Sequence, residues 1–236
     1  MVLTALLGLN FSFLPEYRSY FQNGVAYTIL LALFTVLLAV LPALLLALMR
    51  LSESKILNVL ALIYIEIIRG TPMLVQLAIV YYGLFGAIKL PNLYIFGFIN
   101  IAQFVPGIFA LAINSAGYVA EIIRGGILAV DRGQTEAARS LGLNQSQCMR
   151  LVVLPQAIKN ILPALGNEFV TIIKESSICS TIGMYELMWG ANAVRGATYI
   201  PFEPLLVAAA LYFCMTFPTS KLIAYLERRM RRGDIR

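Results

Sequence analysis

Six charged side chains inside hydrophobic stretches of this sequence are candidates for binding chemistry, because a charge there needs an opposite charge or a polar cavity. They are Glu66, Arg69, Glu121, Glu168, Lys174 and Glu175. For the first three we favour structural pairing, for example Glu66 with Arg69, or extension toward a membrane surface. For Glu168 and Glu175 we favour contact with a ligand, although Lys174 could pair with Glu175. The residue types therefore predict binding chemistry based on carboxylates within a membrane.

The residue types needed for catalysis or metal binding are missing or scattered. The chain has no histidine, and Cys148, Cys179 and Cys214 lie far apart without the spacing of metal ligands. No nucleophile is paired with a base, and no G-x-x-x-x-G-K-[ST] loop is present to hold the phosphates of ATP. We expect no enzyme active site, no metal and no cofactor in this chain.

The composition indicates an all-α polytopic membrane protein. Hydrophobic residues make up 60% of the 236 residues and charged residues 13%, against about 25% charged in soluble domains. The net charge of +6 is explained by membrane topology, so we expect no nucleic-acid partner. About 20 apolar residues cross a bilayer, and five stretches qualify. They are 24–49, 56–88, 106–123, 157–178 and 204–225.

The second stretch is too long for one straight span, and Gly70-Thr71-Pro72 interrupts it. Proline removes a backbone donor and clashes with the preceding turn, so we expect a helix broken at Gly70 and Pro72. If the break is a re-entrant turn, the chain crosses the membrane six times instead of five.

Lysine and arginine predict the orientation. With the N-terminus outside, 13 of the 18 basic residues fall in inner loops and the tail, against Arg18, Lys89 and Arg195 outside. This positive-inside bias favours an odd number of spans and a cytoplasmic C-terminus. We divide the chain into an interfacial lead-in (1–23), a transmembrane domain (24–225) and a basic tail (226–236). The lead-in lacks the pattern of a cleaved signal peptide, and the tail would lie near anionic lipid.

The inner loop at about 130–156 predicts a surface helix. From Gly133 to Arg150, small and apolar residues fall on one broad face of a helix, and Leu154-Pro155 would end it and start the next element. The face consists of Ala137, Ala138, Leu141, Gly142, Cys148 and Met149. Small residues anchor poorly in lipid but allow close approach of another backbone, so we expect a docking surface for a soluble protein. An ordinary amphipathic helix on the membrane surface is the alternative.

The loop resembles the coupling-loop signature of ABC importer permeases. Glu136-Ala137-Ala138, then Gly142, then Val152 and Leu154-Pro155 follow its spacing, with isoleucine usual where Val152 stands. Residues 66–72, 154–157 and 174–177 look like permeases of the polar amino-acid uptake family, the histidine, glutamine, glutamate, arginine and opine group. The similarity covers nearly the whole chain, from about 24 to 225, and is weakest at 89–104.

The resemblance implies a type I ABC importer permease fold: five transmembrane helices, the second broken, with a cytoplasmic coupling helix. Separate ATPase subunits, two per complex, would receive the coupling segment and switch the pore between outward and inward access. The segment consists of Glu136, Ala137, Ala138, Leu141 and Gly142. A second permease copy or close paralogue and an extracytoplasmic solute-binding protein would complete the assembly, in the cytoplasmic membrane of a bacterium.

A polar amino acid as substrate needs acceptors for its ammonium group and donors for its carboxylate. Six polar residues could line its pathway: Thr71, Asn114, Asn167, Glu168, Thr171 and Glu175. The helix break at Gly70-Thr71 adds free backbone groups. The excess of carboxylates suggests a cationic amino acid. The sequence leaves open which amino acid is carried and whether the permease pair is homodimeric.

Two other functions stay open. An ion-coupled secondary transporter would need no ATPase but would leave the docking loop unexplained. A membrane scaffold without transport would leave the broken helix and the buried charges unexplained. Dependence of transport on ATP separates the importer from the ion-coupled transporter.

Overall fold

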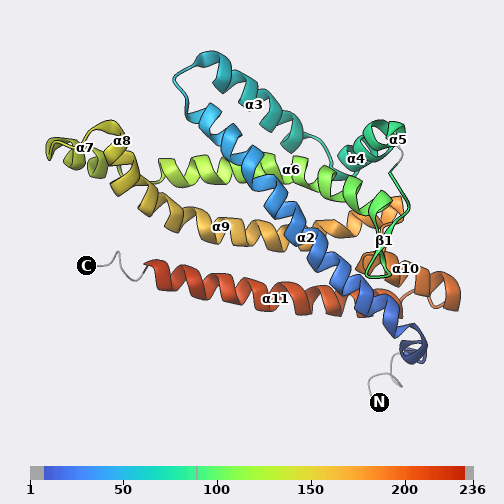
Figure 1. The fold of residues 1–236 in the computed structure, drawn as a ribbon. Coiled ribbons are helices and arrows are strands. Elements are labelled where there is room, and N and C mark those ends of the chain that lie inside the picture. The colour runs from blue at the N-terminus through green and yellow to red at the C-terminus, as the bar shows by residue number, and fades with distance from the viewer. Residues whose placement is uncertain (1–7, 89, 232–236) are drawn as a thin grey trace. The chain divides into compact units, whose positions relative to one another are not determined.

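The computed structural model of the chain describes residues 8–88 and 90–231, most of them helical (Figure 1). Within that part, four helical runs are long and apolar enough to cross a bilayer, and a broken pair of helices makes a fifth. The four runs are α2 (Leu14–Leu51), α6 (Ile101–Leu128), Gln145–Ile182 with α9 (Leu154–Glu175) inside it, and α11 (Glu203–Arg231). The predicted five-span helical fold is confirmed.

All four helical runs extend beyond the predicted spans, most clearly at the start of α2 and the end of α11. α2 begins at Leu14 rather than at residue 24, and α11 continues to Arg231 rather than ending at residue 225. Basic side chains such as Arg18 do not stop a helix, because their long stems reach the polar interface. Residues 1–7, Lys89 and 232–236 lie outside the described residues, so the first part of the lead-in and the end of the basic tail stay predictions.

The second span is broken as expected, between α3 (Lys55–Gly70) and α4 (Met73–Ala78). Thr71 (φ −117°, ψ 144°) and Pro72 (φ −63°, ψ 137°) are extended, which is the conformation a proline favours in the residue before it. The Thr71 hydroxyl donates to the Ile67 carbonyl at 2.8 Å and so satisfies a carbonyl at the end of α3. The π-helical turn η1 (Ile79–Leu84) and α5 (Phe85–Ala87) follow α4.

The chain forms two compact units, each described by itself. The alanine-core unit comprises residues 36–71, 112–170 and 219–231. Its core contains Ala39, Ala43 and Ala47 of α2 with Ala112, Ala116 and Ala120 of α6, none more than 4% exposed. The spacing of four residues aligns these side chains along one face of each helix. Small side chains let helix backbones approach closely, so this core depends on alanine at each position.

The second unit, which we call the α10 unit, comprises residues 8–35, 72–111 and 171–218. Its core surrounds α10 (Leu187–Thr198), a helix that the sequence did not predict. A Cβ atom on Gly24 would lie 2.8 Å from the Leu187 Cα, and one on Gly190 would lie 2.9 Å from the Tyr20 carbonyl oxygen. The close approach of α2 to α10 therefore requires glycine at both positions.

A short antiparallel hairpin precedes α6 in the same unit. It consists of β1 (Tyr94–Ile95) and β2 (Ile99–Asn100), with Tyr94 opposite Asn100 and Ile95 opposite Ile99. Its turn has two residues with positive φ, Phe96 at 52° and Gly97 at 76°. The hairpin falls in the segment where the sequence resemblance was weakest.

Candidate functional site

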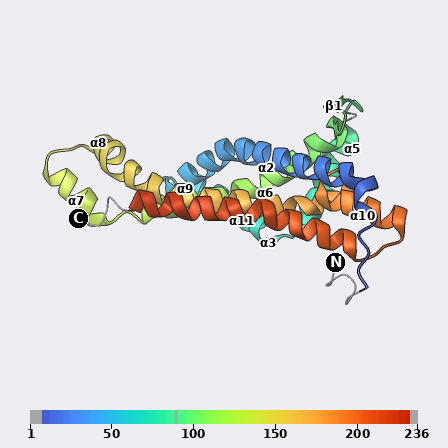
Figure 2. The same ribbon diagram turned by 90° about the horizontal axis from the view of Figure 1, so that it is seen from below.

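The loop between α6 and α9 contains two short helices instead of the single one predicted. α7 (Arg132–Ser140) and α8 (Gln145–Cys148) both lie beyond the start of α9 (Figures 1 and 2). The prediction of one helix from Gly133 to Arg150 is therefore wrong. Gly142 separates the two helices with a φ of +88°, a left-handed conformation that glycine adopts without a Cβ clash.

Both ends of α7 are capped. At its start, the Asp131 carboxylate accepts a hydrogen bond from the Gly133 N–H at 2.6 Å. At its end, the Gly142 N–H donates to the Arg139 carbonyl at 3.0 Å, and the Leu143 N–H donates to the Ala138 carbonyl at 3.2 Å. These two bonds form a Schellman motif. The nine-residue helix is thus fixed at both termini and can move as one body.

α8 begins with a capping box formed by Asn144 and Gln147. The Asn144 side chain accepts from the Gln147 N–H at 2.9 Å, and the Gln147 side chain accepts from the Asn144 N–H at 3.0 Å. The π-helical turn η2 (Met149–Val153) then joins α8 to α9. Leu154-Pro155 begins α9, as predicted, but η2 leads directly into it, so the expected end of the preceding helix at Leu154 is absent. Proline is tolerated there because it lies in the first turn of α9.

The two helices bury one part of the predicted docking face and expose the rest. Ala138 is 5% exposed and Cys148 is 2% exposed, and both pack with Val153. The exposed residues of the predicted coupling segment, which we call the coupling patch, are Glu136, Ala137, Leu141 and Gly142. Leu141 is 85% exposed at the end of a capped helix. A projecting leucine beside small residues suits close contact with another protein.

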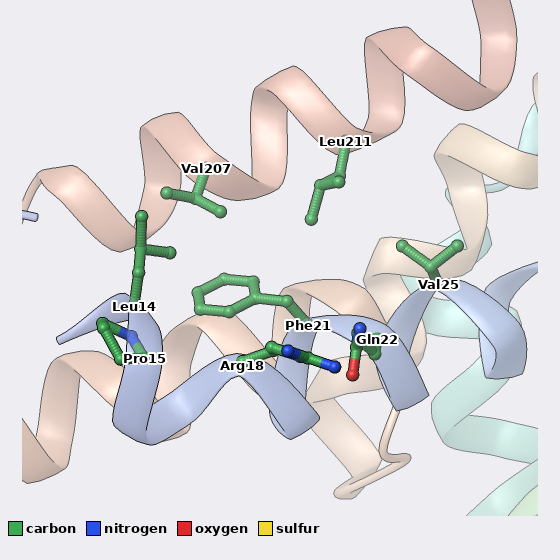
Figure 3. A pocket seen from close by; sticks show the side chains of 8 residues that line it. All are labelled: Leu14, Pro15, Arg18, Phe21, Gln22, Val25, Val207 and Leu211. Atoms are coloured by element: carbon green, nitrogen blue, oxygen red, sulfur yellow. The ribbon is translucent and has the colours of Figure 1, made fainter.

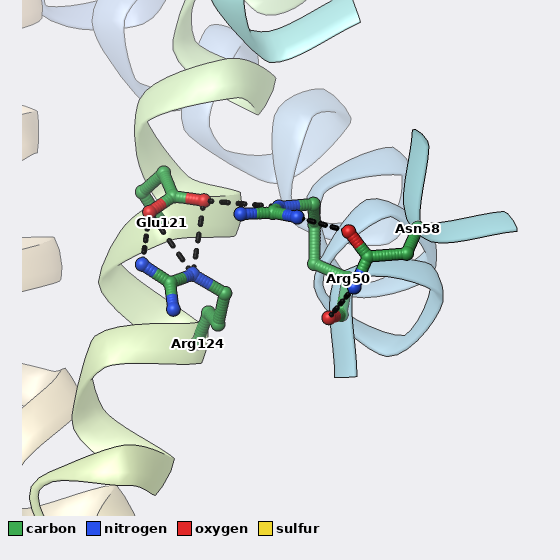
Figure 4. Close-up of polar contacts among 4 residues, drawn as sticks. All are labelled: Arg50, Asn58, Glu121 and Arg124. Carbon is green, nitrogen blue, oxygen red and sulfur yellow. Dashed lines mark hydrogen bonds and ion pairs between the residues drawn. The ribbon is translucent and has the colours of Figure 1, made fainter. Parts of the chain in front are cut away.

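Glu121 belongs to a network of opposite charges that joins α2, α3 and α6 (Figure 4). Its carboxylate accepts from Arg124 Nη2 at 2.7 Å and from Arg124 Nε at 3.0 Å, and it lies 3.7 Å from Arg50 Nε. Arg50 also donates to the Asn58 side-chain oxygen, and the Asn58 side-chain N–H donates to the Arg50 carbonyl at 2.9 Å. The structural pairing expected for Glu121 is confirmed.

The other pairings given as examples are not present. Glu66 and Arg69 are both exposed and form no ion pair within the described part of the chain. The Arg69 guanidinium instead lies 5.5 Å from the centroid of the Tyr118 ring, a cation–π contact. Lys174 and Glu175 likewise form no ion pair with each other.

Four of the six candidate pathway residues lie in the alanine-core unit. They are Thr71, Asn114, Asn167 and Glu168. The Ser115 hydroxyl donates to Glu168 Oε1 at 2.9 Å, a contact between α6 and α9, next to Asn114, which is 5% exposed. Asn167 is exposed. Ser115 was missed in the sequence, where only its position beside Asn114 could have indicated it.

The other two candidates, Thr171 and Glu175, lie half-buried in the α10 unit. Near them, Lys174 and Ser177 line a cavity of about 580 Å³ whose other walls come from α10 and α11. The Ser177 hydroxyl donates to the Lys174 carbonyl at 2.7 Å, and Lys174 is exposed. A cation at an apolar cavity can bind a carboxylate, so Lys174 joins the candidates.

Glu186, between the fourth and fifth spans, is a fully buried carboxyl that the sequence did not indicate. One oxygen accepts from the Trp189 N–H at 2.7 Å, and the other accepts from the Met188 N–H at 2.8 Å and the Tyr212 hydroxyl at 2.7 Å. Burial raises the pKa of Glu186 to about 7, although these hydrogen bonds favour the ionised form. The carboxyl caps α10 and ties it to α11.

Comparison with known proteins covers most of the chain. Residues 39–232 match the sequence profile of the family described as binding-protein-dependent transport system inner membrane component. The arginine transport system permease protein ArtQ of Bacillus subtilis (strain 168) is 36% identical over 228 residues, which are 97% of this chain and 100% of that protein. A putative glutamine transport system permease protein, GlnP of Rickettsia conorii, is 38% identical over 208 residues. The match covers 88% of this chain and 91% of that protein.

A solved structure is also similar. One chain in the crystal structure of an amino acid ABC transporter with histidines is 47% identical, with a TM-score of 0.85. The match covers 94% of this chain and 99% of that one. Sequence and fold therefore agree over nearly the same residues.

Proposed function

This chain belongs to the family of binding-protein-dependent transport system inner membrane components, and on that premise we propose that it carries polar, preferably cationic, L-amino acids across the cytoplasmic membrane of a bacterium. It is a membrane-embedded permease subunit of an ABC amino-acid importer, with the type I permease fold. The chain is not itself an enzyme, because the ATPase of such importers is a separate subunit. Such permeases work with ATPase subunits and substrate-binding proteins.

The observation that carries the proposal is the coupling patch at the end of α7. Leu141 projects beside the small residues Ala137 and Gly142, and caps at both ends make α7 rigid. We propose that this patch inserts into a groove of the ATPase. Closure of the ATPase around ATP would then move α7 as a lever and alternate access to the pore. ATP must favour one arrangement over the other for such switching to occur.

For the substrate pathway we propose Glu168 as the main acceptor for a cationic group, with Asn114 and Asn167 beside it. Ser115 supports this assignment, because its hydroxyl orients the Glu168 carboxylate. The other proposed pathway residues are Thr71 in the alanine-core unit and, in the α10 unit, Thr171 and Glu175, where Lys174 could bind a carboxylate. The cationic preference depends on these carboxylates alone.

We propose an assembly of two ATPase subunits, two permease chains and an extracytoplasmic binding protein. The second permease chain is a copy or a close paralogue. The distribution of lysine and arginine supports an N-terminus outside and a C-terminus in the cytoplasm. In that orientation the coupling patch lies on the cytoplasmic side, where ATP is available.

Purification of the tagged chain from its native membranes in mild detergent tests the coupling. We expect an ATPase to co-purify in stoichiometric amount. Leu141→Asp should lower its yield and ATP-driven uptake in proteoliposomes at least about tenfold, because a charge would be buried without a partner. Gly142→Asp should have the same effect.

Ser146→Asp is the matched control, since it adds the same charge to an exposed position of the same loop. It should keep both the ATPase and the uptake. Wild-type uptake in Leu141→Asp would contradict the docking proposal. Uptake by the chain alone, driven by an ion gradient without ATP, would favour the ion-coupled transporter instead.

A further inference from the structure

An apolar groove lies in the α10 unit, between the first turns of α2 and of α11. It encloses about 690 Å³, a volume within the range of ligand pockets. Figure 3 shows Phe21 of α2 facing Val207 and Leu211 of α11 across the groove. Leu14 and Val25 extend the apolar wall along α2.

One cation faces this apolar lining. Arg18 follows Leu14 by four residues and precedes Phe21 by three, a spacing that places it on the same helix face. Arg18 is exposed and forms no ion pair with any other residue that the structure describes. Glu203, the acid at the start of α11, is already engaged, because its carboxylate accepts from the Asn10 N–H at 2.8 Å. The groove therefore presents an arginine that has no ion-pair partner in the described part of the chain.

The position of Arg18 along α2 corresponds to the level of lipid headgroups. No charged residue occurs between Arg18 and Arg50 on this helix. Their 32-residue separation corresponds to about 48 Å at 1.5 Å per residue, slightly more than the roughly 40–45 Å of a bilayer with its headgroups. Each arginine thus falls near one membrane surface. The groove continues from Arg18 toward Val25, along the uncharged part of the helix.

We infer that the groove binds a membrane phospholipid, with an acyl chain along the α2–α11 wall and the phosphate on Arg18. A guanidinium group matches phosphate oxygens with two parallel N–H donors, and Gln22, one turn on, adds an amide donor. The apolar lining supplies the complement for the acyl chain. This site requires only that the chain is embedded in a membrane, so it stands apart from the proposed substrate.

Photocrosslinking in nanodiscs tests the site. The purified importer, with its ATPase partners, is reconstituted with phosphatidylglycerol that carries a diazirine on one acyl chain, and the labelled peptides are identified by mass spectrometry. In the wild type we expect adducts on residues 14–25 and 203–211. Arg18→Gln should reduce them about tenfold, as expected for loss of a charge-assisted hydrogen bond. Arg18→Lys should keep most of them.

Val207→Trp fills the groove without changing its charge and should also reduce the adducts. The matched controls are Arg228→Gln and Leu226→Trp, exposed positions on α11 outside the groove; both should label like the wild type. Co-purification of the ATPase shows that each variant is folded.

Several results would overturn the inference. Equal labelling of Arg18→Gln and wild type would show that no phosphate is bound at Arg18. Equal labelling by a diazirine diacylglycerol, which lacks phosphate, would show the same. Loss of labelling in excess inorganic phosphate would identify an ion site in place of a lipid site. Crosslinks from the groove to a second permease chain, without lipid adducts, would identify an interface between copies.

Discussion

Glu168 is the single residue on which the proposed substrate preference depends most. Its carboxylate is oriented by the Ser115 hydroxyl at 2.9 Å. Glu168→Gln removes the charge but keeps the shape of the side chain. We expect the KM for arginine to rise at least about tenfold, and that for glutamine to change less, because only charge-assisted bonds are lost. Uptake into proteoliposomes with the ATPase and binding protein measures both.

Ser115→Ala is the control for this substitution, because it removes the orienting hydroxyl and keeps the charge. It should weaken arginine uptake less than Glu168→Gln does. If Glu168→Gln transports arginine like the wild type, Glu168 is not a substrate contact.

Two identical pentapeptides show what a sequence can predict about charged residues. Residues 66–70 and 121–125 both read Glu-Ile-Ile-Arg-Gly. In the second, Glu121 pairs with Arg124, and Arg50 also approaches the carboxylate. In the first, Arg69 contacts the Tyr118 ring, and Glu66 forms no ion pair with any residue that the structure describes. The spacing allows an i,i+3 ion pair in both segments. Whether the pair forms depends on the neighbouring residues from other helices, which the sequence pattern does not show.

Glu186 should make stability depend on pH. Its pKa is raised from the usual 4.5 to about 7 by burial. Between these values the folded chain keeps a proton that the unfolded chain has lost, so stability falls as the pH rises through this window. We expect the wild-type Tm to fall more between about pH 5.5 and 7.5 than that of Glu186→Gln, whose neutral amide does not titrate. Thermal unfolding of the purified complex at both pH values measures this.

Glu53→Gln serves as the control, since Glu53 is an exposed residue in the α2–α3 connection. Its Tm should shift with pH as the wild-type Tm does. An equal shift for Glu186→Gln would show that the buried carboxyl stays ionised over this range.

At the scale of elements, the inner loop shows what the periodicity of small residues can predict and what it cannot. The pattern of small residues correctly indicated helix at α7, but the single-helix interpretation ignored local stop and start signals. Gly142 ends α7, and Asn144 with Gln147 begins α8. These signals are readable in the sequence. The burial of Ala138 against Cys148 could not be read from the sequence, because it depends on how α8 packs against α7.

Gly142→Ala should loosen the turn between α7 and α8. At a φ of +88° the Cβ of an alanine lies too close to the following carbonyl oxygen, which costs about 1–2 kcal/mol. Hydrogen exchange at the Gly142 and Leu143 amide positions, which donate in the Schellman motif, should become about 5–30-fold faster. Mass spectrometry of the intact complex measures the rates.

Gly125→Ala is the matched control, because Gly125 is helical and a Cβ there meets nothing within 4 Å. It should leave the exchange of the loop unchanged. Unchanged exchange in Gly142→Ala would mean that the Schellman turn does not limit the motion of α7.

For the whole molecule, composition and hydropathy were sufficient for the five spans, because crossing a bilayer imposes a long apolar run. The same reasoning missed α10 and the β1–β2 hairpin. Both are shorter than a span, and their positions depend on contacts such as Gly24 with Leu187 and the hydrogen bonds of Glu186. Sequence hydropathy carries no signal for such contacts, which form only after the helices have packed.

The orientation is the remaining property of the whole chain, and two exposed positions test it. Tyr199, between α10 and α11, is 92% exposed, and Leu141 is 85% exposed. In a chain whose cysteines 148, 179 and 214 are replaced by serine, Tyr199→Cys should react with a membrane-impermeant maleimide in intact cells. Leu141→Cys should react only after permeabilisation, because the positive-inside bias predicts a cytoplasmic location for its loop. The reverse pattern would put the coupling patch on the side without ATP and would contradict the ATPase docking that we propose.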